Sequence, residues 1–152
     1  MNCAITTLER CWYLSPPWGQ EILPIKSNAL ERVYLRTTNT FGYCCGVEWK
    51  HDQWIYTIVC GYKIVHATKH QIVGTGRMQI TNLEKPAFVL GERVMFRFHG
   101  NSTKQRLILG IRLVNESWLY VVELVSPALE KTISFENRLA LVREKDLVRV
   151  NV

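Results

Sequence analysis

The sequence predicts an all-β protein in which one unit of five short strands occurs twice. Apolar residues alternate with polar residues over short runs that end at turn-forming residues, which is typical of β-strands. Short motifs also recur at a nearly constant distance along the chain. Of the 152 residues, 47% are hydrophobic and 21% are charged, which is the composition of a folded protein and not of a disordered one.

The recurring motifs fall into three blocks. The first two blocks are shifted by 61 and 64 residues, and a weaker third block is shifted by 75. Because the shift grows, we expect insertions in loops near residues 101–105 and 125–138. The matched blocks are Glu31-Arg32-Val33 with Glu92-Arg93-Val94, then Gly46-Val47 and Trp54-Ile55-Tyr56 with Gly110-Ile111 and Trp118-Leu119-Tyr120, and last residues 67–73 with 142–148.

Each copy is expected to contain five strands, a tight turn between the second and third strands, and a polar turn before the fifth. His51-Asp52 and Asn115-Glu116 supply the tight turns. The polar turns are residues 68–71 and 143–146. The expected strands are residues 32–36, 43–49, 53–59, 63–67 and one ending near 75, then 93–98, 106–113, 117–124, 138–142 and one ending near 150.

This arrangement resembles the SH3-like barrel shared by Tudor, KOW and bacterial SH3-like domains. The resemblance covers about residues 29–76 and 90–151 and implies a fold, not a function. It also implies that each polar turn, residues 68–71 or 143–146, is a single 3₁₀ turn. The predicted fold is therefore a tandem pair of SH3-like five-stranded barrels packed together, with an N-terminal extension. Its expected divisions are an extension packing on the barrels (1–28), the first barrel (29–76), a linker (77–89) and the second barrel (90–152).

The third strand of each copy has two apolar faces. Trp54, Tyr56 and Ile58 are expected to face the interior of the first barrel, as are Trp118, Tyr120, Val122 and Leu124 in the second. The opposite face carries Ile55, Thr57 and Val59, or Leu119, Val121 and Glu123. Because a barrel of this size buries little surface, we expect the two barrels to pack together through these outer faces.

At the level of the whole chain, residues 8–19 and 41–47 are similar to a small cyanobacterial family of uncharacterised proteins of about 150 residues. That resemblance implies no activity. The N-terminal residues lack the apolar stretch of a signal peptide, and no later segment is long and apolar enough for a membrane span. We therefore expect a cytoplasmic protein with reduced cysteines.

The sequence contains no recognisable catalytic or metal-binding motif, and we expect no cofactor. Cys44, Cys45 and Cys60 correspond to aliphatic residues in the other copy, which favours a packing role. His66 and His70 have the spacing of metal ligands on a helix, but they fall in a predicted strand and turn. An enzyme with a Cys or His nucleophile is the least favoured alternative, and it requires an accessible cysteine beside a histidine.

Charge and aromatic residues suggest a binding role. The chain carries 19 Lys and Arg against 13 Asp and Glu, a net charge of +6. We expect a non-enzymatic binding or adaptor protein with a protein partner, and the alternative is a nucleic-acid-binding protein whose paired arginines contact phosphates. For the arginines, solvation of exposed strands is the favoured explanation, and packing between the barrels explains the aromatic residues as well as binding does. The candidate contact residues are Arg32 and Arg36 with their counterparts Arg93 and Arg97, and the aromatic residues Tyr34, Tyr43, Trp49 and Tyr62.

Overall fold

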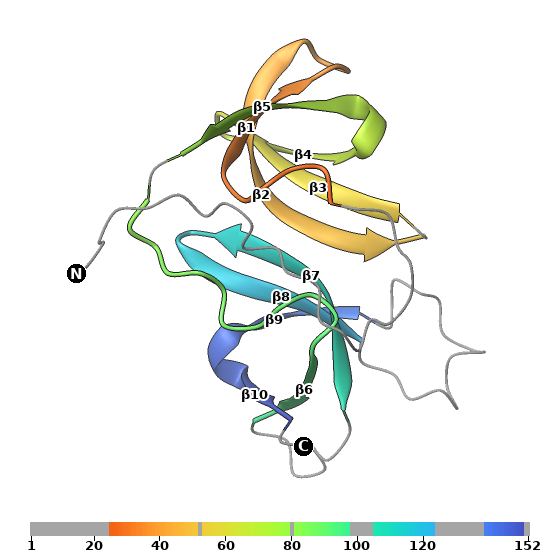
Figure 1. Cartoon of the computed structure of the whole chain (residues 1–152). Helices are drawn as coiled ribbons and strands as arrows, with labels where there is room; N and C mark the ends of the chain where they lie inside the picture. Colours follow the sequence, from red (N-terminus) through yellow and green to blue (C-terminus); the bar gives the residue numbers. More distant parts are fainter. Residues whose placement is uncertain (1–24, 52, 80, 98–104, 124–138, 151–152) are drawn as a thin grey trace.

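The computed structural model describes residues 25–51, 53–79, 81–97, 105–123 and 139–150. In this part the protein is all-β, with ten strands and two short 3₁₀ helices (Figure 1). The elements are β1 (Glu31–Leu35), β2 (Thr40–Lys50), β3 (Gln53–Cys60), β4 (Lys63–Thr68), η2 (Lys69–Gln71), β5 (Ile72–Met78), β6 (Arg93–Phe96), β7 (Arg106–Val114), β8 (Ser117–Glu123), β9 (Leu139–Arg143), η5 (Glu144–Asp146) and β10 (Leu147–Arg149).

The two halves of the chain share one order of antiparallel pairings. In the first half β1 pairs with β2 and β5, while β3 pairs with β2 and β4. In the second half β6 pairs with β7 and β10, while β8 pairs with β7 and β9. A 3₁₀ helix precedes the last strand of each half. The strand positions and both 3₁₀ turns predicted from the sequence are confirmed, with small differences at their ends.

Local backbone conformation explains the two tight hairpins. His51, at the β2–β3 turn, has a φ of 53°, and Asn115 and Glu116 at the β7–β8 turn have φ values of 49° and 64°. Tight turns between antiparallel strands need such left-handed residues, because this turn geometry matches the twist of the strands. Each hairpin also contains an irregularity at a matching place, between Cys44 and Gly46 and between Ile108 and Gly110.

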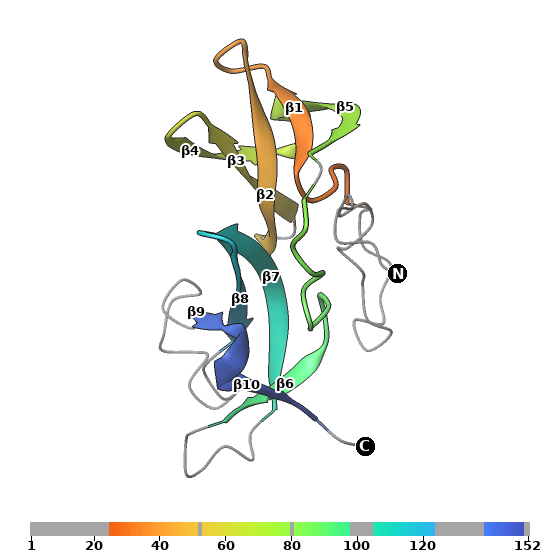
Figure 2. The same cartoon turned by 90° about the vertical axis from the view of Figure 1, so that its left-hand side faces the viewer.

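The two halves are joined by backbone pairing between β2 and β7. Val47 lies opposite Ile111, with Gly46 opposite Arg112 and Glu48 opposite Gly110. All ten strands therefore belong to one continuous hydrogen-bonded sheet. Figures 1 and 2 show β1–β5 and β6–β10 as two lobes, with one end of β2 meeting one end of β7 between them.

This join corrects the prediction that the outer faces of the third strands pack against each other. β3 pairs with β2, β2 with β7, and β7 with β8. Two strands therefore separate β3 from β8 in the hydrogen-bonded order. The direct connection between the halves is the backbone pairing of β2 with β7, and not the outer faces of β3 and β8 that were expected to form it.

Glycines allow β2 and β7 to approach each other. A Cβ atom at position 46 would lie 3.1 Å from the carbonyl oxygen of Ile111. A Cβ atom at position 110 would lie 2.9 Å from Cβ of Glu48 and 3.0 Å from the carbonyl oxygen of Val47. These distances are shorter than side-chain contacts normally allow, so the recurring glycine serves the close contact between the two strands.

Most of the buried hydrophobic residues of both halves form one contiguous core. Trp54, Tyr56 and Ile58 are buried, as the alternation in β3 predicts, and so are Trp118, Tyr120 and Val122 in β8. Val47 and Ile111, at the centre of the β2–β7 pairing, belong to the same core. The pairing therefore joins the two apolar interiors as well as the two sheets.

The described end of the predicted N-terminal extension lies against the first half. Ile25 packs against the core, and the backbone N–H of Lys26 donates to the Tyr56 hydroxyl at 2.7 Å. The ammonium of Lys26 donates to the carbonyl oxygens of Lys69 and Ile72 at 2.8 and 2.9 Å. Residues 1–24, the interior strand position Leu124 and most of the two predicted insertions lie outside the described residues.

Candidate functional site

A cluster of aromatic and basic side chains lies on the outer surface of β1 and β2. Arg32 is opposite Tyr43 and Tyr34 is opposite Phe41, and directly opposite residues of an antiparallel pair point to the same side. Val33 and Leu35, which alternate with them along β1, are fully buried. We call the surface formed by Arg32, Tyr34, Phe41 and Tyr43 the β1–β2 face.

The side chains of the β1–β2 face contact one another. The Arg32 guanidinium carbon lies 4.5 Å from the centroid of the Phe41 ring. The Tyr34 and Phe41 ring centroids are 5.2 Å apart at an interplanar angle of 61°, a favourable edge-to-face arrangement. The Tyr34 hydroxyl donates to Oδ1 of Asn39 at 2.6 Å. The rings and the guanidinium are therefore held in a defined arrangement before any partner binds.

Exposed apolar side chains are concentrated in the first half. Phe41 is 48% exposed and Ile64 is 63% exposed. The strand register extends the β1–β2 face over neighbouring strands. On β5, Val73 lies opposite Tyr34. On the other side, Val59 of β3 lies opposite Tyr43, and Ile64 of β4 lies opposite Val59. Contiguous exposed apolar surface of this kind marks interaction sites in folded proteins. Of the large hydrophobic residues described as exposed, only Leu141 belongs to the second half, and the others are Phe41, Tyr43, Tyr62, Ile64 and Val73.

The first half of the chain, which carries this apolar surface, has a net positive charge. Residues 25–79 contain seven Lys and Arg and three Asp and Glu, a net charge of +4. Two of the three acids are engaged elsewhere: Glu31 is buried, and Glu48 forms an ion pair with Arg112 at 3.5 Å. Arg32 and Arg36 are exposed, and neither forms an ion pair with a carboxylate in the part of the chain that the structure describes.

The structure separates the arginines that the sequence analysis grouped. Arg32 lies on β1 and Arg36 in the turn directly after it. Arg93 and Arg97 belong to the other half, and β2 and β7 lie between β1 and β6. Arg97 donates to the carbonyl oxygen of Lys145 at 2.9 Å and to that of Leu147 at 3.4 Å. Arg97 therefore stabilises the turn around η5. Arg93 is exposed, but the residue two positions after it is the half-buried Met95, whereas the equivalent residue of the first half is Tyr34.

The predicted aromatic residues also separate. Tyr34 and Tyr43 belong to the β1–β2 face, and Tyr62 is 97% exposed at the β3–β4 turn. Trp49 does not share this surface, because it is half-buried and lies edge-on to Trp54, with ring centroids 5.0 Å apart. Sequence analysis missed Phe41, although the short turn between β1 and β2 would have placed it opposite Tyr34.

Cys44 and Cys45 are poor nucleophiles. Burial raises the pKa of the Cys44 thiol from its ordinary value of 9.0 to about 12 and the pKa of Cys45 to about 11. Both thiols are therefore protonated at neutral pH. Within the described residues, no three His, Cys, Asp or Glu side chains are grouped as metal ligands would be. His66 lies on β4 and His70 in η2, so no helix places them together.

The raised pKa of Cys44 predicts a stability loss at high pH. The unfolded thiol loses its proton near pH 9 and the folded thiol near pH 12, so between these values the folded state binds more protons and is destabilised as pH rises. We expect the free energy of unfolding, measured in urea, to decrease over this window. Cys44→Val, which introduces an aliphatic side chain as at the equivalent Ile108, should reduce that decrease, and an unchanged pH dependence would contradict the assignment.

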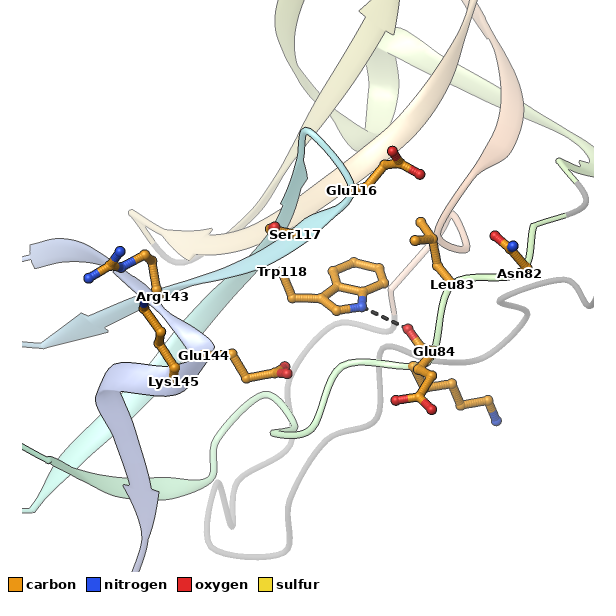
Figure 3. A pocket seen from close by; sticks show the side chains of 10 residues that line it. Asn82, Leu83, Glu84, Glu116, Ser117, Trp118, Arg143, Glu144 and Lys145 are labelled. Carbon is orange, nitrogen blue, oxygen red and sulfur yellow. Dashed lines mark hydrogen bonds between the residues drawn. The ribbon is translucent and has the colours of Figure 1, made fainter. Parts of the chain in front are cut away.

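The second half contains a pocket of about 710 Å³ between residues 82–85, the start of β8 and η5 (Figure 3). The indole N–H of Trp118 donates to the carbonyl oxygen of Glu84 at 2.8 Å and fixes the connecting segment. Glu144 accepts hydrogen bonds from the backbone N–H of Ala87, at 3.0 Å, and from the Tyr120 hydroxyl. The pocket is lined by three acidic and three basic side chains, and this balance selects neither anions nor cations.

Comparison with curated proteins and with solved structures gave no match. Within the described residues, no helical segment has the length and apolar character needed to cross a membrane. A family model described as a protein of unknown function, DUF1392, matches residues 1–150, nearly the whole chain. The chain therefore belongs to the DUF1392 family.

Proposed function

We propose that the protein is a non-enzymatic binding or adaptor protein, built from two SH3-like units, that engages a protein partner through the β1–β2 face. The observation that carries this proposal is the cluster formed by Arg32, the exposed Phe41 and Tyr43, and the half-buried Tyr34. Aromatic residues and arginine are enriched where proteins bind each other, and exposed apolar surface costs solubility unless it is used.

The proposed relationship between the two units is supported by matching hydrogen bonds. The backbone N–H of Leu30 donates to the carbonyl oxygen of Cys44 at 2.6 Å, and that of Gly91 donates to Ile108 at 2.8 Å. These pairs are related by the shifts found in the sequence. Two further pairs match: Arg36 N–H to the Gln71 oxygen with Arg97 N–H to the Asp146 oxygen, and Glu31 N–H to the Asn28 oxygen with Glu92 N–H to the Val89 oxygen.

Binding to nucleic acid is the second candidate, because the Arg32 guanidinium over the exposed Phe41 ring resembles a stacking platform for bases. The engagement of Arg97 with backbone carbonyls weakens the expectation of four arginine contacts to phosphates. The remaining exposed arginines of the predicted set are divided between the two halves. Protein therefore remains the favoured partner.

The test is co-purification from extract of the source cells, with and without nuclease treatment. The baits are the full chain, a variant carrying Phe41→Ser and Tyr43→Ser, and a control carrying Leu141→Ser. Leu141 is 47% exposed on β9, so the control removes an equally exposed apolar residue from the other half. We expect the full chain and the control to retain a protein that the double variant loses.

Two results would overturn the proposal. Retention of the same proteins by the double variant would show that the β1–β2 face does not bind them. Partners that disappear after nuclease treatment would favour nucleic acid instead. Circular dichroism and urea unfolding of each bait establish that the substitutions leave the fold intact, which is expected because the replaced side chains are exposed.

A further inference from the structure

We propose, on the basis of the proposed function, that the segment bound by the β1–β2 face is an extended acidic peptide in which acidic residues alternate with an apolar residue. Arg32 and Tyr34 occupy alternate positions of β1 and so share the outer side of the sheet. Arg36 is exposed in the turn that directly follows β1, two residues beyond Tyr34, where its backbone N–H still pairs with the carbonyl oxygen of Gln71. Alternate residues of an extended strand are about 7 Å apart, so about 14 Å separates the two arginine positions. Alternate side chains of an extended peptide have the same spacing. Three of them, on one side of the peptide, can therefore face Arg32, Tyr34 and Arg36 in turn.

The chemistry of these positions selects carboxylates at both ends. A guanidinium presents a planar set of donors that matches the two oxygens of a carboxylate. Phe41 supports one face of the Arg32 guanidinium at 4.5 Å from the ring centroid. The backbone N–H of Arg36 donates to Gln71 at 2.8 Å, which extends the ordered backbone one residue beyond β1. Neither guanidinium has a carboxylate partner in the described part of the chain.

The side chains between the arginines select an apolar residue at the centre of the peptide. Tyr34 lies between Phe41 on β2 and Val73 on β5, and both are exposed. A nucleic-acid strand places a phosphate at each nucleotide and is best bound by a continuous basic track. The β1–β2 face instead places apolar side chains between two basic ones, which complements an acidic and apolar peptide.

Synthetic peptides test this inference on the purified full chain. The probe is a fluorescein-labelled ten-residue peptide that alternates glutamate with valine and carries a central phenylalanine in place of one glutamate. Fluorescence anisotropy should show that it binds, and that a peptide with lysine in place of glutamate does not. Affinity should decrease as salt increases, because the charges are exposed.

Charge reversal gives the decisive comparison. Arg32→Glu with Arg36→Glu should weaken binding of the glutamate peptide by about 30-fold and create binding of the lysine peptide. The matched control is Arg93→Glu with Lys145→Glu, two exposed residues of the second half with the same change of charge, and it should retain the original affinity and preference. Circular dichroism checks the fold of both variants.

Three results would overturn the inference: equal affinity for both peptides, an equal loss in the control variant, or no binding of the glutamate peptide. Tighter, Arg32-dependent binding of a single-stranded oligonucleotide would replace it with the nucleic-acid alternative. If the peptides fail while a cellular protein is still lost from the Phe41/Tyr43 variant, the acidic segment is excluded and the proposed function stands. If the peptides fail and the Phe41/Tyr43 variant also retains the same cellular proteins as the full chain, the proposed function is overturned too.

Discussion

Gly110→Val is expected to destabilise the protein by about 3 kcal/mol or more, because the new side chain would enter the contact between β7 and β2. Even its Cβ atom would lie 2.9 Å from Cβ of Glu48 and 3.0 Å from the carbonyl oxygen of Val47. These neighbours belong to a strand held by backbone pairing and cannot move aside separately. The measurement is the free energy of unfolding in urea.

Whether Gly110→Val lowers or raises the free energy of unfolding shows whether β2 and β7 are paired. Valine favours β-strands more than glycine does, so at an unpaired strand position the substitution should stabilise the protein. Gln53→Val, at an exposed position of β3, is the control and should change stability by less than about 0.5 kcal/mol. A neutral or stabilising effect of Gly110→Val would contradict the pairing.

Glu31→Ala is expected to cost about 3 kcal/mol, since it removes the acceptor for several buried or half-buried donors. Oε1 of Glu31 accepts from the backbone N–H of Asn28 at 2.9 Å and from the Ser27 hydroxyl at 3.4 Å. Oε2 accepts from the backbone N–H of Gly76 at 3.0 Å. The carboxylate, on a residue only 5% exposed, therefore connects the turn before β1 to β5.

Two comparisons separate these hydrogen bonds from a general effect of removing charge. Glu31→Gln keeps one acceptor oxygen and should cost about half as much. Glu48→Ala removes a carboxylate from a partly exposed ion pair with Arg112 and should cost less than about 1 kcal/mol. If the Glu31 and Glu48 substitutions were equally mild in urea unfolding, the buried hydrogen bonds would not be stabilising β1 as described.

The strands could be predicted from the sequence because each is marked by local chemistry. Alternation placed Trp54, Tyr56 and Ile58 in the interior, and all three are buried. Asn115 tolerates the left-handed backbone that the β7–β8 turn requires, so the turn was also visible. Such features depend on near neighbours in the chain, which is why they survive without knowledge of the tertiary structure.

The join between the halves could not be predicted from side-chain patterns. β2 and β7 pair through backbone groups, which every residue carries, so no side-chain pattern identifies the partner strand. The recurring Gly46-Val47 and Gly110-Ile111 were recognised as a repeat, but their contact across the two halves was not. A glycine within an apolar strand is the available signal, because it marks close approach of another backbone.

The β1–β2 face was only partly predicted, because outward direction alone does not show which side chains meet. Alternation placed Arg32 and Tyr34 outward, and the structure adds Phe41 through the register of β1 and β2. Trp49 was grouped with them, but at the far end of β2 it packs on Trp54. Arg97 was expected in solvent, whereas backbone carbonyls near η5 engage its guanidinium.

Site-specific photo-crosslinking in the source cells tests the central claim most directly. A photoreactive amino acid replaces Phe41 on the β1–β2 face or, as the control, Leu141 on β9, both of which are about half exposed. We expect a discrete, nuclease-resistant protein adduct from position 41 and none of that size from position 141. The same adduct from both positions, or only nucleic-acid adducts from position 41, would contradict it.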